Sequence, residues 1–81
     1  MLRISVKSKL KPEEAVKRAV AFFGPGGYGL TVEEQTDDSV YLRGGGGGVV
    51  VTTGIEKKGS SVELVSREWD YQVKEFIDTI K

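Results

Sequence analysis

The chain has 81 residues, enough for one small domain that buries roughly 60% of the surface of its unfolded chain, which leaves little room for a large cavity. Twelve basic and twelve acidic side chains give a formal net charge of zero, and this balance argues against a domain built to bind the phosphate backbone of nucleic acid. Cysteine and histidine are absent from the sequence, so we expect a protein that is not an enzyme and carries no metal or cofactor.

The first predicted element is a strand, because every second residue from Leu2 to Val6 is apolar. A helix is predicted to begin at Pro12, since proline suits the first helical position and the two glutamates that follow complement the positive end of the helix dipole. Gly24 is predicted to end this helix as a cap, just before a proline that cannot continue it.

The second half of the chain predicts four strands and a closing helix. The strands are expected at residues 30–35, 39–44, 47–56 and 61–68. The helix is expected to begin at Trp69 or Asp70, with an apolar stripe that continues through Phe76 to Ile80. No apolar stretch has the length of a signal or membrane-spanning segment, so we expect a soluble, cytoplasmic protein with no membrane association.

These elements predict an α+β fold of one domain, residues 1–81, in the order β-α-β-β-β-β-α. The apolar strand residues can all share one face of a five-stranded antiparallel sheet, and two helices must then cover that single face in a two-layer arrangement. The first strand is expected beside the last, giving the sheet order 2-3-4-5-1. The alternative is an edge position beside the second strand. The predicted apolar face consists of Leu2, Ile4, Val6, Leu30, Val32, Val40, Leu42, Val49, Val51, Ile55, Val62 and Leu64.

Strand registers follow from the requirement that apolar side chains face the same side. Pairing Leu42 with Val49 leaves two glycines, residues 45–46, as a type I′ turn. Pairing Ile55 with Val62 leaves residues 58–59 as the next turn, and the same register sets Glu68 opposite Val49. The start of the closing helix is thereby expected at the same end of the sheet as the glycines.

The run of five glycines at residues 44–48 is longer than a two-residue turn requires. Each glycine costs about 0.5–1 kcal/mol relative to alanine, so the surplus predicts a surface that a ligand or a partner approaches closely. The alternative is a flexible hairpin without a binding role. Trp69 is expected to be a buried anchor between the first helix and the sheet. The candidate binding residues are Tyr28, Arg43, Gly44, Gly47, Gly48 and Trp69.

On the opposite face of the sheet, the alternation predicts a small apolar patch of Tyr41, Val50 and Val65. A chain of this size gains from burying additional apolar area, so we predict a weak homodimer or an unknown protein partner at this patch. A small interface of this kind is transient, with a dissociation constant in the micromolar range or weaker. The function favoured by the sequence is therefore that of a non-catalytic binding or interaction module.

The order of elements, with a closing helix that begins within the segment 67–76, resembles the helix-grip domains of the polyketide-cyclase and pollen-allergen superfamily. Members of that superfamily are longer, with two further strands and a longer terminal helix, and hold hydrophobic molecules between a curved sheet and that helix. The resemblance implies an alternative function, a small hydrophobic-ligand-binding or hydrolytic domain. Its pocket would lie beneath Trp69 and be lined by Phe22, Phe23 and Tyr71.

Overall fold

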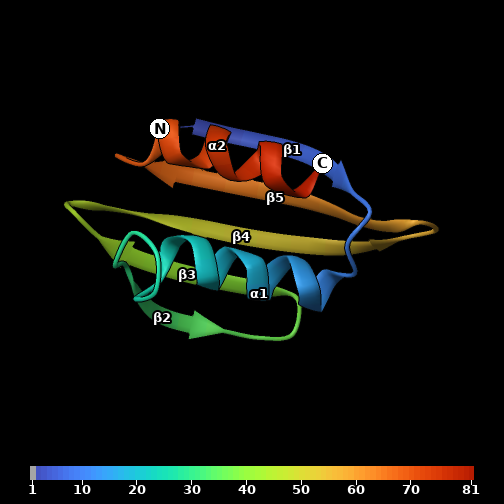
Figure 1. Cartoon of the computed structure of the whole chain (residues 1–81), viewed down its shortest axis with the longest axis horizontal. Helices are drawn as coiled ribbons and strands as arrows, with labels where there is room; N and C mark the ends of the chain where they lie inside the picture. The colour runs from blue at the N-terminus through green and yellow to red at the C-terminus, as the bar shows by residue number, and fades with distance from the viewer. Residues whose placement is uncertain (1) are drawn as a thin grey trace.

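Five strands and two helices follow one another in the predicted order β-α-β-β-β-β-α (Figure 1). The computed structural model describes residues 2–81. The strands are β1 (Leu2–Ser8), β2 (Thr31–Gln35), β3 (Ser39–Gly44), β4 (Gly47–Glu56) and β5 (Gly59–Arg67). The helices are α1 (Pro12–Phe23) and α2 (Asp70–Ile80). The α+β class and the order of elements are thus confirmed.

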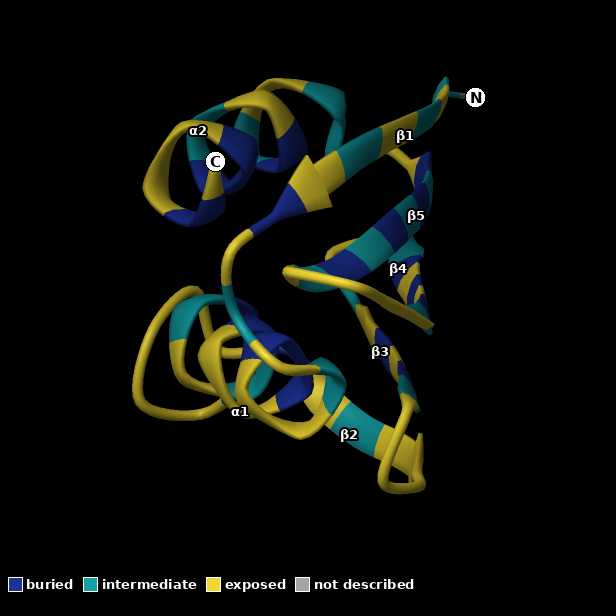
Figure 2. Cartoon of the chain, turned by 90° about the vertical axis from the view of Figure 1, so that its right-hand side faces the viewer, coloured by how far each residue is buried: buried dark blue, intermediate teal, exposed yellow. Residues whose placement is uncertain are grey.

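The five strands form one antiparallel sheet in the order β1-β5-β4-β3-β2, as predicted. Both helices lie on the same side of this sheet, which gives two layers (Figure 2). The other side of the sheet, called the outer face below, carries no helix. None of the helices within residues 2–81 is long and apolar enough to cross a lipid bilayer.

The core lies between the sheet and the two helices. Helix α1 contributes an apolar stripe that includes Val16 and Phe23, and α2 contributes Phe76 and Ile80, all almost completely buried. Burying a large aliphatic or aromatic side chain stabilises the folded state by about 1.5–3 kcal/mol. The buried strand residues of the core are Val40, Leu42, Val49, Val51, Val62 and Leu64.

The hairpin of β3 and β4 has the predicted register, with Leu42 opposite Val49. Gly45 and Gly46 form its turn with φ angles of 58° and 82°. Positive φ at both central positions is the requirement of a type I′ turn, and glycine meets it without steric cost. The conformation of the turn is therefore enough to explain glycine at both positions.

The register predicted between β4 and β5 is wrong by two residues. Thr53 rather than Ile55 lies opposite Val62, and the tip of this hairpin is formed by Lys57 and Lys58. The prediction placed the turn at residues 58–59, but Gly59 instead pairs with Glu56 at the end of the ladder. Its φ is 133°, and a Cβ atom there would lie 2.0 Å from the carbonyl oxygen of Ser8, so the backbone of the β1–α1 connection demands glycine at this place.

The shifted register also corrects the predicted position of Ile55 in the core. Ile55 is 84% exposed, whereas Thr53, two residues earlier on the same side of β4, is 8% exposed. The β4–β5 hairpin extends beyond the first turn of α1, so no helix covers its tip (Figure 1). The alternation of apolar residues along β4 predicted correctly that Ile55 faces the helix side of the sheet. It could not show that α1 ends its cover of β4 before this residue.

Candidate binding surface on the outer face

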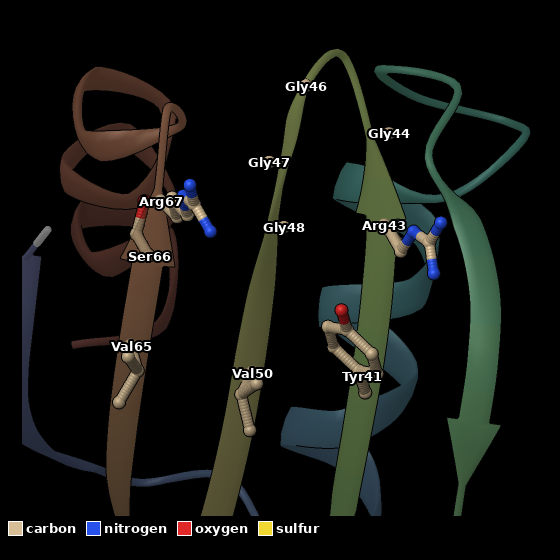
Figure 3. A pocket seen from close by; sticks show the side chains of 10 residues that line it. All are labelled: Tyr41, Arg43, Gly44, Gly46, Gly47, Gly48, Val50, Val65, Ser66 and Arg67. Carbon is tan, nitrogen blue, oxygen red and sulfur yellow. The ribbon is translucent and has the colours of Figure 1, made fainter.

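Two rows of side chains cross the outer face near the glycine-rich turn (Figure 3). In the first row, Gly48 of β4 lies between Arg43 of β3 and Arg67 of β5. In the second row, Val50 lies between Tyr41 and Val65. Neighbouring strands are about 4.8 Å apart, so the two arginines start about 10 Å from each other across a strand with no side chain between them.

The two rows line one open depression of about 620 Å³. Its lining joins the apolar patch to the outer half of the glycine-rich end, two features that the sequence predicted as separate candidates. Tyr41 and Val50 are 38% and 37% exposed, so an arriving group can contact both. The depression is lined by Tyr41, Arg43, Gly44, Gly46, Gly47, Gly48, Val50, Val65, Ser66 and Arg67.

The charge on this surface is positive and partly available. Arg43 is paired with Glu33 through a long contact of 3.9 Å between Nη1 and Oε1, and its side chain remains 66% exposed. Arg67 is exposed, and none of the ion pairs formed within residues 2–81 involves it. A long, exposed ion pair contributes little to stability, so Arg43 can exchange Glu33 for another anion at small cost.

Most of the glycine run is explained by contacts inside the domain. A Cβ atom at Gly47 would lie 2.0 Å from the carbonyl oxygen of Arg67, and one at Gly48 would lie 2.8 Å from that of Leu42. Gly44 differs, because a Cβ there would meet Leu30 at an ordinary 3.5 Å. The surplus of glycine is thus smaller than the sequence suggested. At Gly47 and Gly48, the group that approaches closely is the backbone of the neighbouring strands rather than a ligand or a partner.

Trp69 covers the glycine-rich turn from the opposite side of the sheet. Its indole Nε1 donates a hydrogen bond to the carbonyl oxygen of Gly44 over 2.9 Å, and a Cβ at Gly45 would lie 2.8 Å from its Cζ2 atom. Trp69 is partly buried and packs against the core, with its ring centroid 5.8 Å from that of Tyr28. The indole therefore rests on the hairpin turn and contributes an internal support to the surface on the other side.

Tyr28 is tied to α2 by a side-chain hydrogen bond. Its hydroxyl donates to Oε1 of Glu75 over 2.8 Å. This hydrogen bond to a carboxylate raises the pKa of Tyr28 above its ordinary value. The bond joins the loop that follows α1 to the second helix, on the helix side of the sheet.

Aromatic side chains occupy the place beneath Trp69 where the helix-grip resemblance implies a pocket. The Phe22 and Phe23 ring centroids lie 5.0 Å apart, and each lies within 5.4 Å of Phe76. Side chains therefore pack against each other where a ligand would enter. Tyr71, expected to line this pocket, is 70% exposed.

The sheet separates the sequence-predicted site residues into two groups. Tyr28 and Trp69 lie on the helix side, whereas Arg43 and Gly48 share the outer face. Arg67 was missed as a site residue because the two-residue register error put it opposite Val50. Side chains alternate between the two faces along β5, so Arg67 lies on the same face as Val65. This alternation is the signal in the sequence that indicates Arg67 as a residue of the outer face.

Two guanidinium groups beside a phenol and two valines can bind an anionic group that carries apolar neighbours. Within residues 2–81, no group of three or more acidic side chains is placed to hold a metal ion. No protein-family model matches the chain, and neither does any curated protein or solved structure with which it was compared.

Proposed function

We propose that this protein is a non-catalytic binding module that holds an acidic, partly apolar segment of a partner protein on the outer face of its sheet. The observation that carries the proposal is the single depression in which two arginines adjoin an exposed apolar row. Arg67 can bind a carboxylate directly, and Arg43, whose side chain is directed toward β2 and Glu33 in Figure 3, can turn to join it. The aliphatic or aromatic neighbours of that carboxylate can then lie against Tyr41 and Val50.

The charge distribution favours a short acidic segment over a long polyanion. The chain has no net charge, so attraction at long range is weak and recognition depends on the local pair of arginines. Guanidinium groups bind carboxylates through paired N–H donors, and such bonds are stronger than those between neutral groups. Arg67 supplies this interaction without first leaving an internal ion pair.

The test uses a fluorescein-labelled peptide of alternating glutamate and leucine, with a lysine and leucine peptide of equal length as the comparison. Fluorescence anisotropy should show binding of the acidic peptide only. Arg67→Gln should weaken it about tenfold, because one charged contact of about 1.4 kcal/mol is lost. Arg18→Gln is the matched control, since Arg18 is an exposed arginine of α1 on the other layer.

The apolar half of the surface has its own variant. Val50→Thr keeps the shape of the side chain and replaces a methyl group by a hydroxyl, so it should weaken peptide binding without affecting the fold. Equal binding by the Arg67→Gln and Arg18→Gln proteins, or equal binding of both peptides, would contradict the proposal.

A further inference from the structure

The two edges of the sheet differ in how well they are protected against pairing with another strand. Natural edge strands are kept from pairing by bulges, by charges, or by being short. Edge strand β2 has only five residues, an irregular register between Val32 and Glu34, and two adjacent glutamates, Glu33 and Glu34. A second strand that approached β2 would meet both a distorted backbone and negative charge.

Edge strand β1 is longer than β2 and has no bulge, and its two cations, Arg3 and Lys7, are each paired with a glutamate of the same chain. It pairs with β5 through seven consecutive residue pairs without a shift, so its backbone is regular along its whole length. Leu2, Ile4 and Val6 face the helix side but remain only partly buried, because they lie at the margin of the layer that α2 covers. Among residues 2–81, no strand lies beyond β1 at this edge of the sheet (Figure 2). A regular strand with unpaired backbone groups and incompletely buried apolar residues is a template for a further strand.

We propose that a second copy of this chain pairs antiparallel along β1, which joins two sheets into one of ten strands. A copy is the favoured occupant because β1 is complementary to itself in one register. When Ile4 lies opposite Ile4 of the second copy, Leu2 lies opposite Val6, and Arg3 lies opposite Ser5. From Leu2 to Val6, every apolar residue then meets an apolar residue, and no two like charges meet.

The neighbouring registers that keep both helix layers on the same side are less favourable. Centring the pair on Ser5 sets Arg3 opposite Lys7, and centring it on Arg3 sets that cation opposite itself. Centring it on Val6 sets Ile4 opposite Ser8, a buried residue whose hydroxyl already donates to the carbonyl oxygen of Ile80. Like charges directly opposite each other destabilise a strand pair, so the register is specified by the sequence of β1.

This interface is distinct from the outer-face surface assigned to the partner segment. Pairing at the β1 edges leaves Tyr41, Val50 and Arg67 uncovered and places the two outer faces on the same side of the ten-stranded sheet. An edge contact of one short strand buries little area, so the dimer is expected to be transient, with dissociation in the micromolar to millimolar range. Loss of one interface does not require loss of the other.

A cysteine cross-link tests the register directly, because the chain contains no cysteine of its own. Ile4→Cys places two thiols opposite each other, within the Cα separation that a disulfide spans. Ser5→Cys is the matched control, since in the same register its two copies are offset by two residues, about 8 Å apart. Mild oxidation should give a covalent dimer of the first variant and not of the second. Cross-linking of Ser5→Cys alone would overturn the proposal.

Charge variants at Ser5 separate dimerisation from folding. Ser5 is exposed and lies opposite Glu63 within its own chain and opposite Arg3 of the second copy. Ser5→Lys should therefore stabilise the monomer but weaken the dimer, and Ser5→Glu should do the reverse. The two symmetric contacts predict a change in the dissociation constant of about tenfold in each direction.

Sedimentation equilibrium from 10 μM to 1 mM total protein measures these dissociation constants, and thermal melts measure the fold. A wild-type protein that is strictly monomeric at 1 mM would overturn the proposal. So would a dimer that Val50→Thr disrupts while both Ser5 variants leave it unchanged, because that result would place the interface on the outer-face patch.

Discussion

The indole nitrogen of Trp69 donates a hydrogen bond to the carbonyl oxygen of Gly44, which fastens the start of α2 to the tip of a hairpin 25 residues away along the chain. The bond lies on the helix side of the glycine-rich turn, directly behind the surface that carries Arg43 and Arg67. The position of that surface therefore depends on an aromatic residue that does not reach it.

Replacing Trp69 should separate the hydrogen bond from the ring packing. Trp69→Phe removes the donor and should lower the free energy of unfolding by about 1–2 kcal/mol. Trp69→Ala also removes the contact with Tyr28 and with the turn and should cost about 2–4 kcal/mol. Urea unfolding followed by circular dichroism is the suitable measurement, because this is the only tryptophan of the chain. Equal loss in both variants would show that the ring contributes nothing beyond its donor.

Alanine substitutions at two positions of the glycine run should change the free energy of unfolding in opposite directions. Gly47→Ala should cost about 2 kcal/mol or more, because its Cβ would overlap the backbone oxygen of Arg67. Gly44→Ala should stabilise by about 0.4–1 kcal/mol, since its Cβ meets only ordinary contacts and the unfolded chain loses freedom. Thermal melts of the two variants give the comparison. Stabilisation by both substitutions would mean that the hairpin tip is flexible and that no backbone contact requires glycine at Gly47.

The exposure of Ile55 predicts that this position tolerates a polar residue. Ile55→Thr should change the free energy of unfolding by less than about 0.5 kcal/mol, as is usual for surface positions. Val51→Ala, four residues earlier on the same side of the same strand, should cost about 2 kcal/mol because Val51 is completely buried. Chemical denaturation of both variants checks the register of β4 and β5. A large loss from Ile55→Thr would favour the register predicted from the sequence.

The hydrogen bond from Tyr28 to Glu75 predicts a dependence of stability on alkaline pH. The folded-state pKa of Tyr28 is raised above the ordinary value of 10.0, so its stabilising contribution is fully present below that pH and is lost as the pH rises through the raised value. Tyr28→Phe should remove this part of the pH dependence. Ultraviolet titration of the phenols measures it, and Glu75→Gln should bring the Tyr28 pKa back toward the ordinary value.

Local patterns in the sequence predicted most of the fold. The alternation of β1, Pro12 at the start of α1 and the glycine pair of the β3–β4 turn each reflect interactions within a few residues, and such interactions are visible along the chain. The single apolar face predicted two layers, and the sheet order of the structure is the favoured one of the two that were predicted. The patch of Tyr41, Val50 and Val65 was placed correctly on the outer face.

The parts that the sequence did not predict depend on contacts between distant segments. Considered with its sequence neighbours alone, Gly59 indicates a turn. In the structure, the absence of a side chain at Gly59 leaves space for the backbone of Ser8, which lies 51 positions earlier in the chain. That difference moved the register by two residues and set Arg67 opposite Val50 instead of Gly48. The need for glycine at Gly47 and Gly48 was also not predictable from local sequence, because the backbone that approaches them belongs to other strands of the sheet.

The pairing of β1 with β5 has a consequence for how the protein is made. Strands β2 to β5 are neighbours in sequence and can assemble by closing short loops, but β1 has to wait for the strand farthest from it. During synthesis on the ribosome, the first strand therefore leaves the exit tunnel without a partner. Its backbone pairs only after residues 60–66 have emerged, and the bond from Ser8 to Ile80 closes the fold only when the last helical turn is complete.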